Sequence, residues 1–173
     1  MKKTICVLLC ILALLSLSAC GNKVETEPEE GGNMQIPNPF VDCASLDEAA
    51  RLAGFDIAVP GKFDGYPNVV YQAIKNELIQ VLYFDGDPEA ETSSMVMVRK
   101  GTGEGDISGD YNEYPESETV KMHGVDVTLK GENGLVFCAT WTWNGHAFAI
   151  NADRGLSREA IGSAIGEMVT AVG

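Results

Sequence analysis

The sequence predicts an α+β fold: an antiparallel β-sheet of successive β-hairpins, with one short N-terminal helix and one C-terminal helix packed on it. Three observations lead to this fold class. Short segments of alternating apolar and polar residues follow one another between about residues 55 and 150. Turn-forming residues separate these segments, as they separate the strands of hairpins. Helical periodicity occurs only before and after them, which argues against a parallel sheet, whose strands alternate with helices.

The N-terminal helix is expected from Ser45 to about Ala53. Ser45 and Glu48 have the spacing of a capping box, in which two side chains satisfy free backbone N–H groups at the helix start. Apolar residues recur on one helical face, at Leu46, Ala49, Ala50 and Ala53. Gly54 follows where a left-handed residue commonly ends a helix.

Alternation and turn signals define the expected strands. They cover residues 55–59, 69–75, 78–83, 95–100, 120–122, 125–129, 135–143 and 146–150. The clearest hairpin turns at Asn144-Gly145, a dipeptide that suits a type I′ turn. Its first strand should place one set of side chains on the core: Leu135, Phe137, Ala139, Trp141 and Trp143. The alternative is that Trp141, Trp143 and Phe148 form an exposed aromatic binding surface.

The C-terminal helix is expected from Ser157, its N-cap, to about Val172. Leu156 and Ile161 have the spacing of a hydrophobic staple, which fixes the direction in which the chain enters a helix. A helical stripe of apolar residues should pack on the sheet: Ile161, Ile165, Met168, Val169 and Val172.

The first 19 residues have the pattern of a secretory signal peptide. Lys2 and Lys3 precede an almost entirely apolar stretch over residues 5–17. This stretch is short for a membrane-spanning helix, which needs ~20 apolar residues.

The residues that end the signal, Leu17-Ser18-Ala19-Cys20, resemble the bacterial lipobox. The resemblance implies cleavage before Cys20 and acylation of its sulfur, with palmitate among the lipid chains. More than one chain gives stable anchoring. We therefore expect a lipoprotein held on the extracytoplasmic face of the cell membrane. Residues 20–37 are acidic and poor in apolar side chains, so we expect a disordered linker that leads to a single domain at 38–173.

The composition restricts the class of partner. The chain carries a net charge of −13 at pH 7. Nucleic-acid binding and attraction to anionic lipids both need clustered Lys and Arg, so neither is expected. No motif indicates a cofactor. The partners we expect are the lipid anchor in the membrane and a protein, peptide or envelope ligand.

Two cysteines remain in the expected domain, Cys43 and Cys138. In an oxidising exterior they could form one disulfide. The alternative is that both are buried free thiols.

A polar loop is the best candidate for a binding site. It contains Asp106, Asp110, Tyr111, Asn112 and Tyr114. The oxygen-bearing side chains could contribute to a calcium site, but they lack the spacing of a calcium loop. The alternative is a turn in which Asp and Asn bond to the neighbouring backbone, and we expect no metal. The two tyrosines are the aromatic side chains best placed for exposure.

Catalytic residues are not apparent, and we do not expect an enzyme. His146 with Asp153 or Glu159 could be an acid–base pair. Ser108 lacks the strand–turn–helix context of a hydrolase nucleophile. A hydrolase is therefore the weakest of the functions considered.

Several stretches between residues 38 and 172 resemble domain of unknown function 4367, which occurs in lipoproteins and membrane-anchored anti-sigma proteins of Gram-positive bacteria. They include Asn38-Pro39-Phe40, the residues 45–49 and 53–55, 106–112, 127–131 and 139–145. The resemblance implies an extracytoplasmic domain without known catalysis, and it assigns no functional residue. We expect a non-catalytic binding module, with an accessory role in envelope-stress sensing as the alternative.

Overall fold

The computed structural model describes residues 38–170. The predicted signal peptide, the lipidated Cys20 and the linker lie outside the described residues. The elements are β1 (Val41–Cys43), α2 (Leu46–Ala53), β2 (Asn68–Ile74), β3 (Leu78–Phe84), β4 (Met95–Thr102), β5 (Glu116–Met122), β6 (Val125–Glu132), β7 (Leu135–Trp143), β8 (His146–Ser157) and α3 (Arg158–Thr170). Neither described helix is long and apolar enough to cross a membrane.

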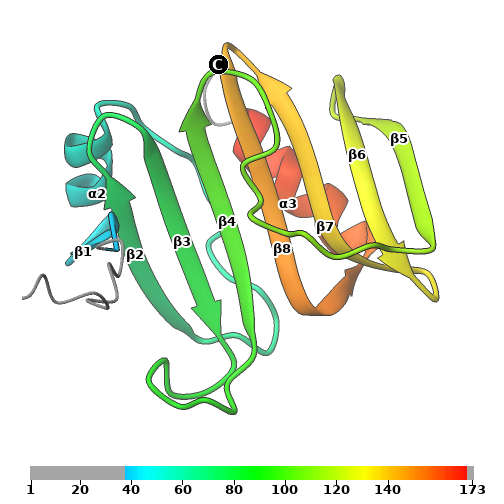
Figure 1. Ribbon diagram of the computed structural model, residues 1–173, viewed down its shortest axis with the longest axis horizontal. Helices are drawn as coiled ribbons and strands as arrows, with labels where there is room; N and C mark the ends of the chain where they lie inside the picture. Colours follow the sequence, from blue (N-terminus) through cyan, green and yellow to red (C-terminus); the bar gives the residue numbers. More distant parts are fainter. Residues whose placement is uncertain (1–37, 171–173) are drawn as a thin grey trace, which may run out of the picture. The chain divides into compact units, whose positions relative to one another are not determined.

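The strands form one eight-stranded sheet in the order β1-β2-β3-β4-β8-β7-β6-β5. Each pair of neighbouring strands is antiparallel. The expected α+β fold, with an antiparallel sheet and two helices, is therefore confirmed (Figure 1).

The sheet is not built from successive hairpins throughout. The β4 and β5 strands follow each other in sequence, but β8, β7 and β6 lie between them in the sheet. The β8 strand is a central strand, paired with β4 on one side and β7 on the other, and its residues Ala147–Ile150 are all buried. The β4–β5 connection consequently crosses three strands.

Both helices pack on the same face of the sheet. One core cluster contains Ala49 and Ala53 of α2, Ile161 and Ile165 of α3, and inward-facing residues from six of the strands. We call this side of the sheet the helix face. Burial of each large apolar side chain contributes about 1.5–3 kcal/mol.

The N-termini of both helices are capped by local side-chain hydrogen bonds. The Ser45 hydroxyl accepts from the Glu48 N–H at 3.2 Å, and the Glu48 carboxylate accepts from the Ala44 N–H at 2.8 Å. In a capping box the Glu48 carboxylate would accept from the N–H of the N-cap, Ser45. Here it accepts from the N–H of the preceding residue, Ala44. At α3, the Ser157 hydroxyl accepts from the Ala160 N–H at 3.1 Å. The end predicted for this helix, at Val172, lies outside the described residues.

The strand predicted at residues 55–59 is wrong. These residues form an irregular segment on the helix face, where Ile57 is buried. The edge of β2 that an added strand would need is occupied by β1, which lacks a sequence signal because it has only three residues. The segment is held by Lys100 instead, whose Nζ donates to the Asp56 carbonyl at 2.6 Å.

The face predicted for β7 is correct at one end of the strand and wrong at the other. Ala139 and Trp141 lie in the core, and Trp143 packs against it. The pairing shifts between Val136 and Cys138, which leaves Phe137 as a bulged residue. A bulge inserts an extra residue and reverses which side chains face inward. Val136 therefore enters the core, whereas Leu135 is exposed.

Candidate functional site

A row of side chains, polar in every strand except β8, crosses the sheet face opposite the helices, and we call it the polar row. The strand register places one residue of each strand in this row: Asp42, Gln72, Gln80, Arg99, Ala149, Thr140, Thr128 and Thr119. We call this side of the sheet the loop face. Opposite side chains in adjacent strands lie close enough to interact. The row therefore joins β1 at one edge of the sheet to β5 at the other.

Residues 103–115 connect β4 to β5 across the loop face, and we call them the crossing loop. Figure 1 shows this connection in front of β8 and β7, with α3 behind the sheet. Arg99 holds the loop: its Nη1 donates to the carbonyls of Ile107 and Ser108 at 2.9 and 2.8 Å. Lys130 of β6 forms a second attachment, with its Nζ 3.4 Å from Asp106 Oδ2.

Asp106 organises the first half of the crossing loop. Its Oδ1 accepts from the backbone N–H of Ser108 at 2.9 Å and from the Ser108 hydroxyl at 2.5 Å. Burial by itself would raise the pKa of Asp106. The hydrogen bonds from Ser108 and the nearby Lys130 outweigh burial and lower the pKa below its ordinary value. Asp106 is therefore a charged acceptor that shapes the loop.

Asp110 organises the second half. Its Oδ1 accepts from the backbone and the side-chain amide of Asn112 at 2.9 and 2.8 Å. Its Oδ2 accepts from the Tyr114 hydroxyl at 2.7 Å. The Tyr114 ring stacks on Phe137, with centroids 5.7 Å apart. Burial first, and then the Asp110 carboxylate, raise the pKa of Tyr114 to about 12. The structure therefore brings three predicted site residues into one bonded group.

These bonds support the interpretation of the loop as an Asx-type turn. The carboxylate oxygens that a calcium ion would need already accept bonds from protein donors. Across residues 38–170, no group of three or more His, Cys, Asp or Glu side chains is arranged to hold a metal ion.

Tyr111 differs from the other predicted loop residues. Its side chain is 96% exposed, the largest value among the exposed large hydrophobic residues of the described chain. The backbone on both sides is held, by Arg99 before it and by the Asp110–Asn112 bonds around it. A loop held by these bonds thus presents an exposed aromatic ring, as recognition surfaces commonly do.

An open groove lies at the end of the loop face near the β7–β8 turn. Its volume is about 670 Å³, within the usual range for ligand sites. Side chains from the crossing loop, β6 and β7 line it, including three carboxylates and three threonines: Glu104, Asp106, Asp126, Thr128, Thr140 and Thr142. No Lys, Arg or His is among its lining residues, so positively charged or hydroxyl-rich groups suit it best.

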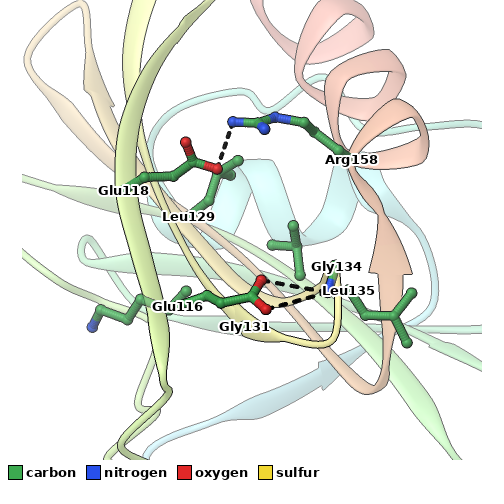
Figure 2. A pocket seen from close by; sticks show the side chains of 9 residues that line it. Glu116, Glu118, Leu129, Gly131, Gly134, Leu135 and Arg158 are labelled. Atoms are coloured by element: carbon green, nitrogen blue, oxygen red, sulfur yellow. Dashed lines mark hydrogen bonds and ion pairs between the residues drawn. The ribbon is translucent and has the colours of Figure 1, made fainter.

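A second, much smaller cavity lies on the helix face beside α3. It measures about 90 Å³ and is lined by Glu118, Leu129 and Arg158, among others. Figure 2 shows Arg158 paired with Glu118 on one side and Glu116 reaching the Gly134 N–H on the other. The Arg158 Nη2 lies 2.6 Å from Glu118 Oε1. Because Arg158 and Glu118 already pair with each other and the volume is small, this cavity is a weaker candidate than the groove.

The possible disulfide between Cys43 and Cys138 is not formed, and both are free thiols. Cys43 lies on β1 and Cys138 on β7, which are separated by five strand spacings of ~4.8 Å each. A disulfide needs Cα atoms within ~7 Å of each other. Burial raises the pKa of both thiols, so neither has the character of a reactive nucleophile.

The acid–base pair considered for His146 is not present. His146 Nδ1 lies 3.0 Å from the Asn144 carbonyl oxygen, and its ring packs on Phe55. Asp153 accepts from the backbone N–H of Met95 instead. The aromatic surface considered for β7 is also not formed, because Trp141 is buried and stacks on Phe148 with centroids 5.2 Å apart.

Sequence reasoning missed Arg99 and the glutamines beside it. Their signal was present: each is a polar residue that directly follows or precedes apolar residues of a predicted strand, namely Gln72, Gln80 and Arg99. Gln80 is only 6% exposed, so it needed hydrogen-bond partners. Which partners it has depends on the register of three strands.

Comparisons of the chain with known protein families, curated proteins and solved structures give no match. The resemblance to domain of unknown function 4367 stays a prediction.

Proposed function

We propose that this protein is a non-catalytic binding module, held by a lipidated Cys20 on the extracytoplasmic face of the cell membrane. The observation that carries the binding role is Tyr111, a fully exposed ring on a loop that is bonded internally and to the sheet. Exposing an aromatic ring to water is unfavourable. Holding it in one place reduces the entropy lost when a partner binds.

The groove next to the crossing loop supports the same surface. The groove is lined both by residues of the crossing loop and by residues of β6 and β7 on the loop face. Its carboxylates and hydroxyls favour a partner with ammonium, guanidinium or hydroxyl groups. A protein, peptide or envelope component with such groups is the ligand class that we propose.

Capture from envelope extracts tests the binding role. The full chain with Tyr111→Ala should lose a partner that the wild type retains, because the substitution removes the exposed ring without touching the core. Leu135→Ala is the matched control, since Leu135 is also an exposed large hydrophobic residue but belongs neither to the crossing loop nor to the groove lining. Equal recovery of all partners by both variants would contradict the proposal.

Membrane attachment is tested separately. Intact mass and membrane fractionation of the wild type should show cleavage before Cys20 and added lipid. A Cys20→Ala variant should lack both. A wild-type mass that contains residues 1–19 would contradict the anchor but would leave the binding role open.

A further inference from the structure

Four side chains of the polar row form a continuous hydrogen-bonded relay across the loop face. Arg99 Nε donates to Gln80 Oε1 at 2.7 Å, and Gln80 Nε2 donates to Gln72 Oε1 at 2.7 Å. Gln72 Nε2 then donates to Asp42 Oδ1 at 2.8 Å. The relay thus runs from β4 to β1 and contains one residue of each strand between them.

The relay has only one satisfactory orientation. Asp42 can only accept hydrogen bonds at its end, and Arg99 can only donate at the other. If either glutamine amide turned over, donors would face donors or acceptors would face acceptors. Gln80 is 6% exposed, so little water is available to replace a lost bond. Bonds in such a chain polarise and support one another.

Arg99 joins the relay to the crossing loop. It binds the loop carbonyls of Ile107 and Ser108. Gly109 lies so close that an added Cβ would stand 2.8 Å from Arg99 Nη1. The position and rotamer of Arg99 therefore decide whether the loop is held in place.

The other end of the relay belongs to residues 38–43, which we call the arm. The arm contacts the relay twice: Asp42 accepts its last bond, and the Phe40 ring lies 5.7 Å from the Arg99 guanidinium carbon. Only three residues of the arm pair with β2, and Val41 is 51% exposed. An element with so few contacts opens more easily than the core does.

We propose that the arm and the crossing loop are coupled through Arg99, so that release of the arm from β2 loosens the loop that presents Tyr111. Release removes the acceptor of Gln72 and the ring over Arg99, which leaves the guanidinium less restrained. A regulatory role, in which release of the arm weakens partner binding through Tyr111, rests on the proposed function. The arm is placed for such a role because it directly follows the predicted linker. The coupling itself is a property of the fold.

Hydrogen exchange of the full chain tests the coupling. The reporters are the backbone amides of Ser108, Asp110 and Asn112, which are all bonded within the loop. The readout is their acceleration divided by that of the α3 amides, so that global destabilisation cancels. Combined Asp42→Ala and Phe40→Ala substitution should give a ratio of at least about five, the lower end of typical coupling between sites.

Two controls accompany this variant. The single substitution Asp42→Asn keeps an acceptor for Gln72 and leaves Phe40 in place, so it should give a ratio near one. Asp64→Ala removes an equally charged side chain that is 94% exposed and paired only with Lys62, and it should also give a ratio near one. Faster exchange of β1 together with a loop ratio near one would overturn the proposal, as would an equal ratio in the Asp64→Ala control.

Coupling must also act in the reverse direction. Gly109→Ala should displace Arg99 and accelerate the amides of Val41–Cys43 relative to α3. Gly103→Ala is the matched control, because Gly103 also has positive φ in the same loop but has no atom within 4 Å of an added Cβ. Equal effects of the two substitutions on the arm would contradict the coupling. Capture with Tyr111→Ala tests the binding role, and hydrogen exchange tests the coupling. The failure of one proposal is therefore recognised independently of the other.

Discussion

The ammonium nitrogen of Lys100 lies 5.3 Å from the centre of the Phe55 ring and 5.6 Å from that of Phe148. Lys100 is 7% exposed, and its Nζ also donates to the Asp56 carbonyl. Burial lowers the pKa of Lys100. The Lys100 side chain thus joins the irregular segment after α2 to the central strands. The sequence had predicted an extra strand for this segment, over residues 55–59.

Lys100→Ala should destabilise the fold by about 2–4 kcal/mol, because it leaves a cavity between two aromatic rings and removes the donor of the Asp56 carbonyl. Lys100→Met should cost at least ~1 kcal/mol less, since its side chain refills the space without a buried charge. Urea denaturation measures both. Lys75→Ala, at an exposed position, should change stability by no more than ~0.5 kcal/mol. Equal losses for the two Lys100 variants would show that packing between the rings is unimportant.

The bond from Tyr114 to Asp110 predicts a dependence of stability on alkaline pH. The folded pKa of Tyr114 is raised from 10 to about 12, so the folded chain keeps this proton when the unfolded chain has lost it. The stabilisation is full below pH 10 and is lost as the pH rises through 12. The difference in unfolding free energy between the wild type and Tyr114→Phe should therefore shrink over this range. A difference that stays constant from pH 9 to pH 12 would contradict the assignment.

Two glycines should respond in opposite ways to alanine. At Gly131 an added Cβ would overlap the Leu135 carbonyl oxygen, next to the β-bulge. Gly131→Ala should cost several times the ~1 kcal/mol of a typical substitution. Gly162 lies within α3 and has no atom within 4 Å of an added Cβ. Gly162→Ala should stabilise by about 0.4–1 kcal/mol, and thermal unfolding of both variants measures the contrast.

The free thiols predict a specific labelling pattern. Cys43 is half-buried and Cys138 is fully buried. A maleimide should label Cys43 slowly in the native chain and Cys138 only after unfolding, because reaction needs an accessible thiolate. Reductant should not raise the intact mass by the two hydrogen atoms that reduction of a Cys43–Cys138 disulfide would add. A mass gain of that size would contradict the fold, since the strand order keeps the two residues apart.

Much of the local structure follows from the sequence because it depends on neighbours in the chain. The Ser45 and Ser157 caps lie at the starts of α2 and α3. Asn133-Gly134 and Asn144-Gly145 adopt the positive φ angles that the hairpin turns need. The self-bonded conformation at Asp106 and Asp110 was the alternative to a metal site, since such side chains bond to backbone two residues away.

Interactions between distant residues could not be obtained in this way. The bulge at Phe137 depends on two neighbouring strands at once, so alternation along β7 assigned Leu135 and Phe137 to the wrong face. The position of β8 between β4 and β7 decides that the crossing loop lies over the sheet. In the sequence Gln80 is a lone polar residue of a buried strand and Arg99 stands next to Lys100, and only the register shows that Gln80 and Arg99 bond to each other.

Propensities and motifs within a few residues were enough to predict the α+β class, the two helices and the hairpin turns, and the lipid anchor at Cys20 stays a prediction. The tertiary structure decided that Cys43 and Cys138 are far apart, that Trp141 is buried and that Tyr111 is exposed. It also decided that Asp42 and Ser108 are linked through Arg99. These relationships depend on the order and register of strands, which are selected by the burial of the whole sheet and not by any one segment.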